Sequence, residues 1–381
     1  VNYGGANTVA IRLNNPKDSS RWYPGGGIYR HVWLTKTFPV HVSQWGTAIT
    51  TPVIGPGEAR VVVKNTVENQ SAAGVDLAVE TKIYALDTND VKQGEAVADG
   101  SGELQLAAGA AGTNSVELLV AHPRLWDVAQ PNRYVAVTTL TQAGKIWDVV
   151  ENKFGIRTAE FTKTAGFLLN GKRVPINGVC DHADLGALGT AVNTRGLQRQ
   201  LEILRGMGGN AIRTSHNPPA PELLDLCDRM GFVVMDEAFD AWKEHKKPND
   251  YASIFADWHE ADVRAYVRRD RNHPCVVLWS IGNEISEQAH SKTFYIAEDL
   301  AAAVRREDTT RPITAACNHL EAGYNGFQNI VNVFGYNYKP FEYGRFRQAN
   351  PEIPLYGSET ASTISSRGEY FFPVSNEKSK G

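Results

Sequence analysis

Two glutamates that follow predicted strands could perform acid–base and nucleophilic chemistry together. Glu284 comes directly after the mostly apolar run Val276–Asn283, and Glu359 comes directly after Pro354–Ser358. The two are far apart in sequence, but the carboxyl ends of parallel strands meet at one edge of a sheet. Glycoside hydrolysis needs such a pair, because one carboxyl group must be protonated to assist the leaving oxygen while the other is ionised. The alternative for each glutamate is an ordinary carboxylate at a strand end.

Other polar side chains also follow predicted strands. They are Asp181 and His182, the segment Arg213–Asn217, Asp236 and Glu237, and the segment Tyr336–Tyr338. Stability alone does not require polar groups at six separate strand ends, so their convergence indicates an active site.

Structural alternatives exist for several of these residues. Arg213 could brace Asp236 or Glu237, His216 could cap the following helix, and Tyr338 could be ordinary packing. We interpret Glu237 as a buried partner of Arg213 rather than as a third catalytic group.

Two further groups of polar residues are not interpreted as functional sites. His182 lies close in sequence to Asp181 and Asp184, but their spacing fits no standard metal site. The charged run Lys243–Lys247 is interpreted as a solvated loop face.

The second half of the chain alternates predicted strands and helices, which is typical of a parallel sheet covered by helices. The predicted strands are Val174–Val179, Asn210–Thr214, Phe232–Asp236, Val276–Ile281, Ile313–Ala316, Ile330–Gly335 and Ile353–Tyr356. The predicted helices are Thr194–Met207, Pro221–Met230, Asp257–Arg271 and Lys292–Arg306. Seven strands predict a (β/α)8 TIM barrel over residues 161–381 that lacks its last unit, with its chemistry at the carboxyl ends of the strands.

Before residue 160 the pattern changes to short β-branched segments separated by turns. Ala59–Val67, Val75–Ala85, Ser115–Val120 and Tyr134–Thr141 are separated by segments rich in Gly, Pro, Asn and Ser. Such spacing predicts an antiparallel β-sandwich.

Six stretches, taken in order, resemble glycoside hydrolase family 2, the family of β-galactosidases and β-glucuronidases. They are Arg21–Arg30, Phe154–Arg157 with Phe167–Gly171, Asn177–Val179 with His182, Arg213–Pro218, Asp270–Pro274 and Trp279–Glu284. The resemblance covers nearly the whole chain. It implies a multidomain fold: the end of a sugar-binding jelly roll (1–42), an immunoglobulin-like β-sandwich (43–160) and the catalytic TIM barrel (161–381). The chain then resembles the middle of a longer glycosidase, truncated at both ends.

The resemblance also implies roles for individual residues. Glu284 matches the acid/base and Glu359 the nucleophile of a retaining enzyme, whose carboxyl groups stand about 5–5.5 Å apart. The matching substrate-binding residues are Asn283, which would bind the sugar 2-hydroxyl, and His182, Arg213, His216 and Tyr338, with Arg21 reaching the substrate from the preceding domain. Magnesium-dependent galactosidases of the family supply a Glu and a His to the metal from the loop after the third strand. The stretch Asp236–Lys243 lacks that pair, so no metal or other cofactor is expected.

The predicted activity is that of a retaining exo-β-glycosidase acting on terminal β-D-galactosides. A β-glucuronidase or β-mannosidase is the alternative within the family, and a non-catalytic carbohydrate-binding protein is the alternative from another class. The expected partner is a β-linked oligosaccharide or glycoside.

Composition restricts the class of protein. Its 39 basic and 42 acidic residues give a net charge of −3, and 42% of the residues are hydrophobic. Disorder and general nucleic-acid binding are thus disfavoured, and no apolar run reaches the ~20 residues of a membrane helix. The four cysteines are far apart and are expected to be buried free thiols. A homo-oligomer is left open, and so is the compartment, bacterial cytoplasm or periplasm.

Overall fold

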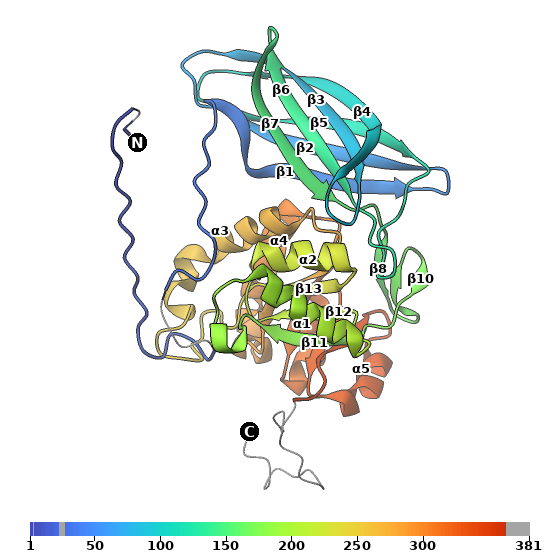
Figure 1. Ribbon diagram of the computed structural model, residues 1–381. Helices are drawn as coiled ribbons and strands as arrows, with labels where there is room; N and C mark the ends of the chain where they lie inside the picture. The colour runs from blue at the N-terminus through green and yellow to red at the C-terminus, as the bar shows by residue number, and fades with distance from the viewer. Residues whose placement is uncertain (3, 23–26, 363–381) are drawn as a thin grey trace.

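The structure is a computed structural model of the 381-residue chain, and it describes residues 1–2, 4–22 and 27–362. Within the described part of residues 1–39 there is no helix or strand, and this segment runs alongside the rest of the molecule (Figure 1). The assignment of residues 1–42 to the end of a jelly roll stays a prediction. Residues 23–26 of the Arg21–Arg30 motif and the last 19 positions assigned to the barrel lie outside the described residues.

Seven antiparallel strands follow and form two sheets. One sheet has the order β1-β2-β5 and the other the order β4-β3-β6-β7. Their bounds are β1 Val40–Ile54, β2 Glu58–Asn69, β3 Val75–Leu86, β4 Lys92–Leu106, β5 Ala111–Ala121, β6 Tyr134–Gln142 and β7 Lys145–Phe154.

The two sheets pack face to face, and we call them the sandwich. Buried and more exposed residues alternate along β2 and β5, as expected for strands with one face in a core. Val61 and Leu118 from one sheet share a buried cluster with Ile83 and Ala136 from the other.

A small antiparallel sheet connects the sandwich to the next unit. Its strands are β8 Ala159–Thr162, β9 Gly166–Leu169 and β10 Lys172–Arg173, in the order β10-β9-β8. Phe167 and Leu169 of β9 pack into the large hydrophobic core that follows.

A seven-stranded parallel sheet makes up the remainder, and its strand order follows the sequence from β11 to β17. The strands are β11 Gly178–His182, β12 Ala211–Ser215, β13 Val233–Glu237, β14 Val276–Asn283, β15 Ile313–Cys317, β16 Phe334–Asn337 and β17 Leu355–Glu359. The helices are α1 Thr194–Gly206, α2 Pro221–Met230, α3 Ala252–Asp270, α4 Phe294–Glu307 and α5 Tyr343–Ala349. Short 3-10 turns occupy Gly186–Leu188, Ser286–Ala289, Ser291–Thr293, Leu320–Gly323, Phe327–Asn329 and Pro340–Glu342.

This parallel sheet is rolled, because side chains of its first strands reach its last strand. Cys180 on β11 donates to the carbonyl oxygen of Ser358 on β17 at 3.4 Å, and Arg213 on β12 contacts Glu359 at the end of β17. Strands β12 to β15 are buried at every position, as strands covered on both faces must be. We call β11–β17 with their helices the rolled sheet; it lies below the sandwich in Figure 1.

Helix α3 and the loop after it join the sandwich to the rolled sheet. The Asn272 side chain accepts from the backbone N–H of Ile49 at 2.9 Å and donates to the carbonyl oxygen of Thr47 at 3.0 Å. Arg271 donates to the carbonyl oxygen of Trp45 at 3.0 Å. A further contact comes from α2, where the backbone carbonyl oxygen of Asp228 accepts from the indole N–H of Trp126 at 2.9 Å.

Several predicted boundaries are wrong by a few residues. Strand β11 begins at Gly178 rather than Val174, because Pro175 has no N–H and Asn177 donates its own to the side chain of Asn210. Strand β16 begins at Phe334 rather than Ile330, which follows a 3-10 turn, and β17 begins at Leu355, after Pro354. The short helix α5 was not predicted.

Two other expectations need correction. Cys227, Cys275 and Cys317 are buried free thiols, but Cys180 is exposed because it lies on the edge strand β11. The Lys243–Lys247 run is not uniformly solvated, because the Lys246 side chain is only 14% exposed. Among the described residues, no helix combines the length and apolar character needed to cross a bilayer.

Candidate active site

A cavity of about 600 Å³ lies inside the rolled sheet, lined from the starts of β12 and β13 at Ala211 and Val233 to the carboxyl ends of the strands. Its lining includes Arg21, Trp22, Cys180, His182, Arg213, His216, Glu284, Tyr338 and Glu359. The structure thus brings every predicted site residue to this wall except Asn283, which is fully buried beside it.

Arg213 on β12 is the centre of the polar network. Its guanidinium donates to Glu359 Oε1 at 2.6 Å, to both carboxylate oxygens of Glu237 at 2.9 Å and to Asn283 Oδ1 at 2.7 Å. Burial opposes the charge of Arg213, but the carboxylates of Glu237 and Glu359 outweigh it and raise its pKa. Arg213 therefore fits both interpretations of the sequence, the structural one and the substrate-site one, because it contacts Glu237 and also the predicted nucleophile.

The surroundings of Glu359 favour its ionised form. Burial acts to raise the pKa of its carboxyl group. The charge of Arg213 and the hydrogen bonds donated by Tyr338 and Arg213 lower that pKa by more, so the net shift is downward. Tyr338 is also placed by its backbone, whose N–H donates to the Glu359 carbonyl oxygen at 2.6 Å. A carboxylate ionised in this way can act as a nucleophile.

Glu284 occupies a different environment. Its backbone φ is +45°, in the left-handed region that non-glycine residues rarely adopt. The Glu284 N–H donates to the Ala316 carbonyl oxygen at 2.7 Å, and the Asn337 side chain donates to Glu284 Oε1 at 3.0 Å. No cation lies within ion-pair distance of Glu284 among the described residues, whereas Arg213 contacts Glu359. The two carboxyl groups are thus unequal, as general acid and nucleophile must be.

Asn283 ends strand β14 with its amide oriented by three side chains. Its Oδ1 accepts from Arg213 and, at 3.1 Å, from Asn337, while its Nδ2 donates to Asp240 Oδ1 at 2.9 Å. These partners lie on β12, at the end of β16 and in the loop after β13, so the orientation of the amide is set by the rolled sheet itself.

Aromatic and imidazole rings form another part of the wall. The Trp22 ring lies 4.5 Å from the His182 ring and 6.1 Å from the His216 ring, measured between centroids. His216 Nδ1 lies 2.8 Å from Glu237 Oε1, so Glu237 orients this imidazole. Burial, with the neighbouring His216, lowers the pKa of His182.

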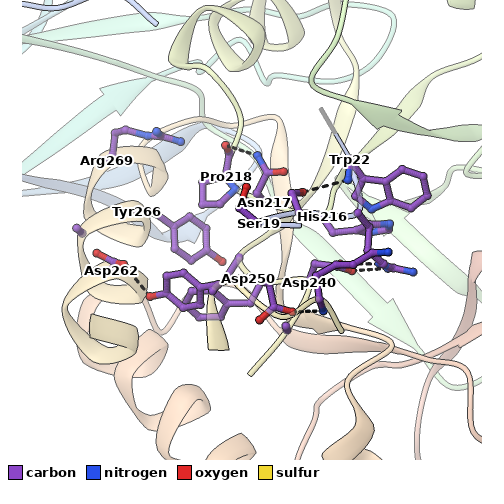
Figure 2. A pocket seen from close by; sticks show the side chains of 18 of the residues that line it. Ser19, Trp22, His216, Asn217, Pro218, Asp240, Asp250, Asp262, Tyr266 and Arg269 are labelled. Carbon is purple, nitrogen blue, oxygen red and sulfur yellow. Dashed lines mark hydrogen bonds and ion pairs between the residues drawn. The ribbon is translucent and has the colours of Figure 1, made fainter. Parts of the chain in front are cut away.

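Arg21 does not lie free in the cavity. Its guanidinium donates to both oxygens of Asp240, at 2.9 and 2.6 Å. Figure 2 shows a neighbouring pocket of about 420 Å³, in which Asp240, His216 and Trp22 lie on one side and Arg269 and Asp262 on the other. Arg21, Trp22 and His216 line both cavities.

Comparison with known proteins identifies the family. A family profile described as "Glycosyl hydrolases family 2, TIM barrel domain" matches residues 161–352, and a second, "Glycosyl hydrolases family 2", matches residues 40–157. The chain belongs to glycoside hydrolase family 2.

Individual family 2 members are similar along much of the chain. A β-galactosidase of Bacteroides ovatus, BoGH2A, is 40% identical over 96% of this chain and 46% of its own length. A β-glucuronidase of Bacteroides fragilis is 31% identical over 84% of this chain and 46% of its own length. A crystal structure of a family 2 member from Bacteroides cellulosilyticus superposes with a TM-score of 0.85, at 38% identity, over 91% of this chain and 44% of that one. The chain therefore spans less than half the length of these relatives.

A group of side chains of the types that bind metal ions lies outside this cavity. Among the described residues, the one group of three side chains close enough to share an ion is Asp228, His273 and Cys275, at the start of β14. It contains none of Asp181, His182 or Asp184. The Asp228 carboxylate already accepts from the Cys275 N–H at 3.0 Å and lies 2.6 Å from His273 Nδ1.

Sequence reasoning missed three residues of this family 2 site. Asn337 was noted at the end of its strand but given no role, although its amide contacts both Asn283 and Glu284. Asp240 and Lys246 lie in the loop after β13, where nothing in their spacing indicates that they fold back onto Asn283. The position of Asn337 was a usable signal, because it immediately precedes Tyr338.

Proposed function

We propose that this chain carries the catalytic centre of a retaining exo-β-glycosidase that hydrolyses terminal β-D-galactosides. The observation that carries the proposal is the unequal pair Glu284 and Glu359 in one cavity, where Arg213 donates to Glu359 Oε1 at 2.6 Å and favours its ionised form. In the first step Glu359 attacks the anomeric carbon while Glu284 donates its proton to the departing glycosidic oxygen, forming a glycosyl ester on Glu359. In the second step Glu284 removes a proton from water, which attacks the anomeric carbon and releases Glu359.

The remaining residues support binding in this proposal. Asn283 would bind the sugar 2-hydroxyl, and His182, His216, Tyr338 and Trp22 would surround the ring. Arg21 would act at the edge of the site, because Asp240 already occupies its guanidinium.

The domain assignment is part of the proposal. We assign residues 1–42 to the end of a sugar-binding jelly roll, 43–160 to an immunoglobulin-like sandwich and 161–381 to a TIM barrel without its last unit. The two-sheet sandwich supports the second part of this assignment and the sequential order β11–β17 supports the third.

The preference for galactose is supported by the name of the Bacteroides ovatus relative. The Bacteroides fragilis relative, named a β-glucuronidase, supports the second candidate within the family. A β-mannosidase is the third candidate, and the experiment below includes its substrate.

The experiment uses the full-length protein that carries this chain and a panel of nitrophenyl β-glycosides: galactoside, glucuronide, mannoside and glucoside. Fastest turnover of the galactoside is expected, and fastest turnover of another sugar would reassign the substrate. Glu359→Gln and Glu284→Gln should each remove most turnover. Azide should rescue a Glu284→Ala variant and yield a β-glycosyl azide, whereas an α-azide would contradict retention. No turnover of any glycoside would favour a non-catalytic carbohydrate-binding protein.

A further inference from the structure

The loop after β13 is tied to the end of β14 by a compact polar network. Asp240 accepts from Arg21 twice, from the Asn283 amide at 2.9 Å and from the Lys246 ammonium at 3.0 Å. Lys246 Nζ also donates to the backbone carbonyl oxygen of Asn283 at 2.8 Å. One loop therefore contacts both the side chain and the main chain of Asn283.

The bond from Lys246 falls on the peptide that leads into Glu284. The carbonyl oxygen of Asn283 and the N–H of Glu284 belong to the same peptide unit. Lys246 binds its oxygen, and the Ala316 carbonyl oxygen accepts from its N–H at 2.7 Å. Both polar groups of this peptide therefore have a hydrogen-bond partner, one from the loop after β13 and the other from β15.

Glu284 needs such support because of its backbone conformation. A non-glycine residue in the left-handed region costs about 1–3 kcal/mol and persists only where the surroundings hold it. With φ at +45°, Glu284 would otherwise relax toward an ordinary conformation, and its carboxyl group would turn with it.

The charges of the loop are arranged to hold the ammonium in place. Burial lowers the pKa of Lys246, while the Asp240 carboxylate opposes that shift. Burial also acts against ionisation of Asp240, but its hydrogen bond with Arg21 and the charge of Lys246 prevail and lower the pKa of Asp240 to about 2. A buried cation is costly unless it is paired in this way.

We propose that Lys246, with Asp240 as its counter-ion, is a positioning residue that fixes the Asn283–Glu284 peptide and thereby aims the Glu284 carboxyl group at the leaving oxygen. This inference rests on the proposed function, in which Glu284 is the general acid. Lys246 is not part of the cavity lining and its ion pair is with Asp240 rather than Glu359, so its removal should impair proton donation more than nucleophilic attack.

The test compares two leaving groups on the sugar that the full-length protein hydrolyses fastest. A dinitrophenyl group departs with little protonation, whereas a phenyl group needs the acid. General acid catalysis contributes about 10²–10⁴-fold, so Lys246→Met should lower kcat/KM for the phenyl glycoside by about 10- to 100-fold. For the dinitrophenyl glycoside the loss should stay below about 3-fold. Lys243→Met is the matched control: Lys243 is exposed and bonds to Tyr295, and its loss should change neither value.

Asp240→Asn provides a second variant, which keeps the size of the side chain and removes the counter-ion. Because Asp240 also orients the Asn283 amide, this variant should lower both values but the phenyl value by more, and Lys246→Arg should recover part of the phenyl activity. Equal losses on both substrates, or no loss on either, would overturn the inference. If the unmodified protein hydrolyses neither glycoside, the proposed function fails instead.

Discussion

Arg213 connects the proposed nucleophile to the other buried polar residues of the candidate active site. One guanidinium contacts the predicted nucleophile, the buried carboxylate of Glu237 and the amide of Asn283. A planar fork of five donors can satisfy several acceptors at once, which a lysine ammonium on a flexible stem does less well. Arg213 therefore sets both the charge and the position of its neighbours.

Replacing Arg213 with Lys should change the pH dependence of catalysis. Arg213 helps to hold the pKa of Glu359 below its ordinary value, so Glu359 stays ionised into mildly acidic solution. Without the fork, that pKa rises toward its ordinary value, and the acidic limb of the kcat/KM profile should move to higher pH by about one unit. An Arg305→Lys variant, changed on the exposed face of α4, should leave the limb in place. An unmoved limb in Arg213→Lys would contradict this account of Glu359.

At this scale, the sequence predicted residues at strand ends and missed those in loops. Glu284, Glu359, Arg213 and His216 could be found because a parallel sheet brings its strand ends together, whatever the loops do. Lys246 could not, since its contact with Asn283 depends on how a long loop folds, and a charged run is ordinarily solvated. The structure corrects that interpretation for Lys246.

The ends of some helices in the rolled sheet could be predicted from local sequence, but the starts of its strands could be predicted less well. Helix α2 was predicted with its observed bounds because Pro221 begins it and Gly231, with φ of +71°, ends it. Helix α3 begins five residues before its predicted start, where the Asp250 carboxylate accepts from the Ala252 N–H at 3.1 Å. Strand starts were less predictable, because Ile330 and Ile353 are apolar without pairing as strands.

The loop after β13 leads to a prediction about metal dependence. In magnesium-dependent galactosidases the corresponding loop supplies a Glu and a His, but the stretch Asp236–Lys243 lacks that pair, and Lys246 places an ammonium group against Asn283 instead. Dialysis of the full-length protein against a chelator should therefore leave turnover of its best substrate unchanged. Loss of turnover that magnesium restores would contradict this prediction.

At the opposite end of β14, Asp228 should stabilise the fold in a pH-dependent way. Burial acts to lower the pKa of His273, but the charge and hydrogen bond of Asp228 outweigh it and raise that pKa. A raised pKa contributes stability below the unfolded value, about 6.5, and the contribution is lost as pH rises through the folded value. Asp228→Asn should thus lower the unfolding free energy by about 2–4 kcal/mol at pH 6 and by less at pH 9.

Denaturant titrations at the two pH values measure this difference. Asp299→Asn, changed on the exposed face of α4, should show no such dependence on pH. A loss of equal size at pH 6 and pH 9 would mean that His273 is not charged in the folded protein.

For the whole molecule, the sequence predicted the order of architectures but not how they join. The change from period-two strands to alternating strands and helices predicts a boundary near residue 160, and the small sheet β8–β10 lies at that point of the chain. The joint itself depends on Asn272 pairing with the β1 backbone and on Arg157, which donates to the carbonyl oxygens of Pro274 and Val276 at 2.8 and 2.6 Å. Contacts of this kind link residues more than a hundred positions apart, and no local pattern encodes them.

Gly155, just after β7, lies where the sandwich contacts the rolled sheet, and replacing it with alanine should disturb that contact. A Cβ atom there would lie 2.7 Å from Cβ of Pro274 and 3.0 Å from Cβ of Trp126, both part of the joint. Neither neighbour is the end of a flexible side chain, so Gly155→Ala must displace the sandwich from the rolled sheet. We expect destabilisation of about 1–3 kcal/mol and, in calorimetry, a single unfolding transition that broadens or splits. Gly57→Ala is the matched control, because a Cβ at Gly57 meets nothing within 4 Å; an unchanged transition in Gly155→Ala would mean that the two units do not depend on this contact for their stability.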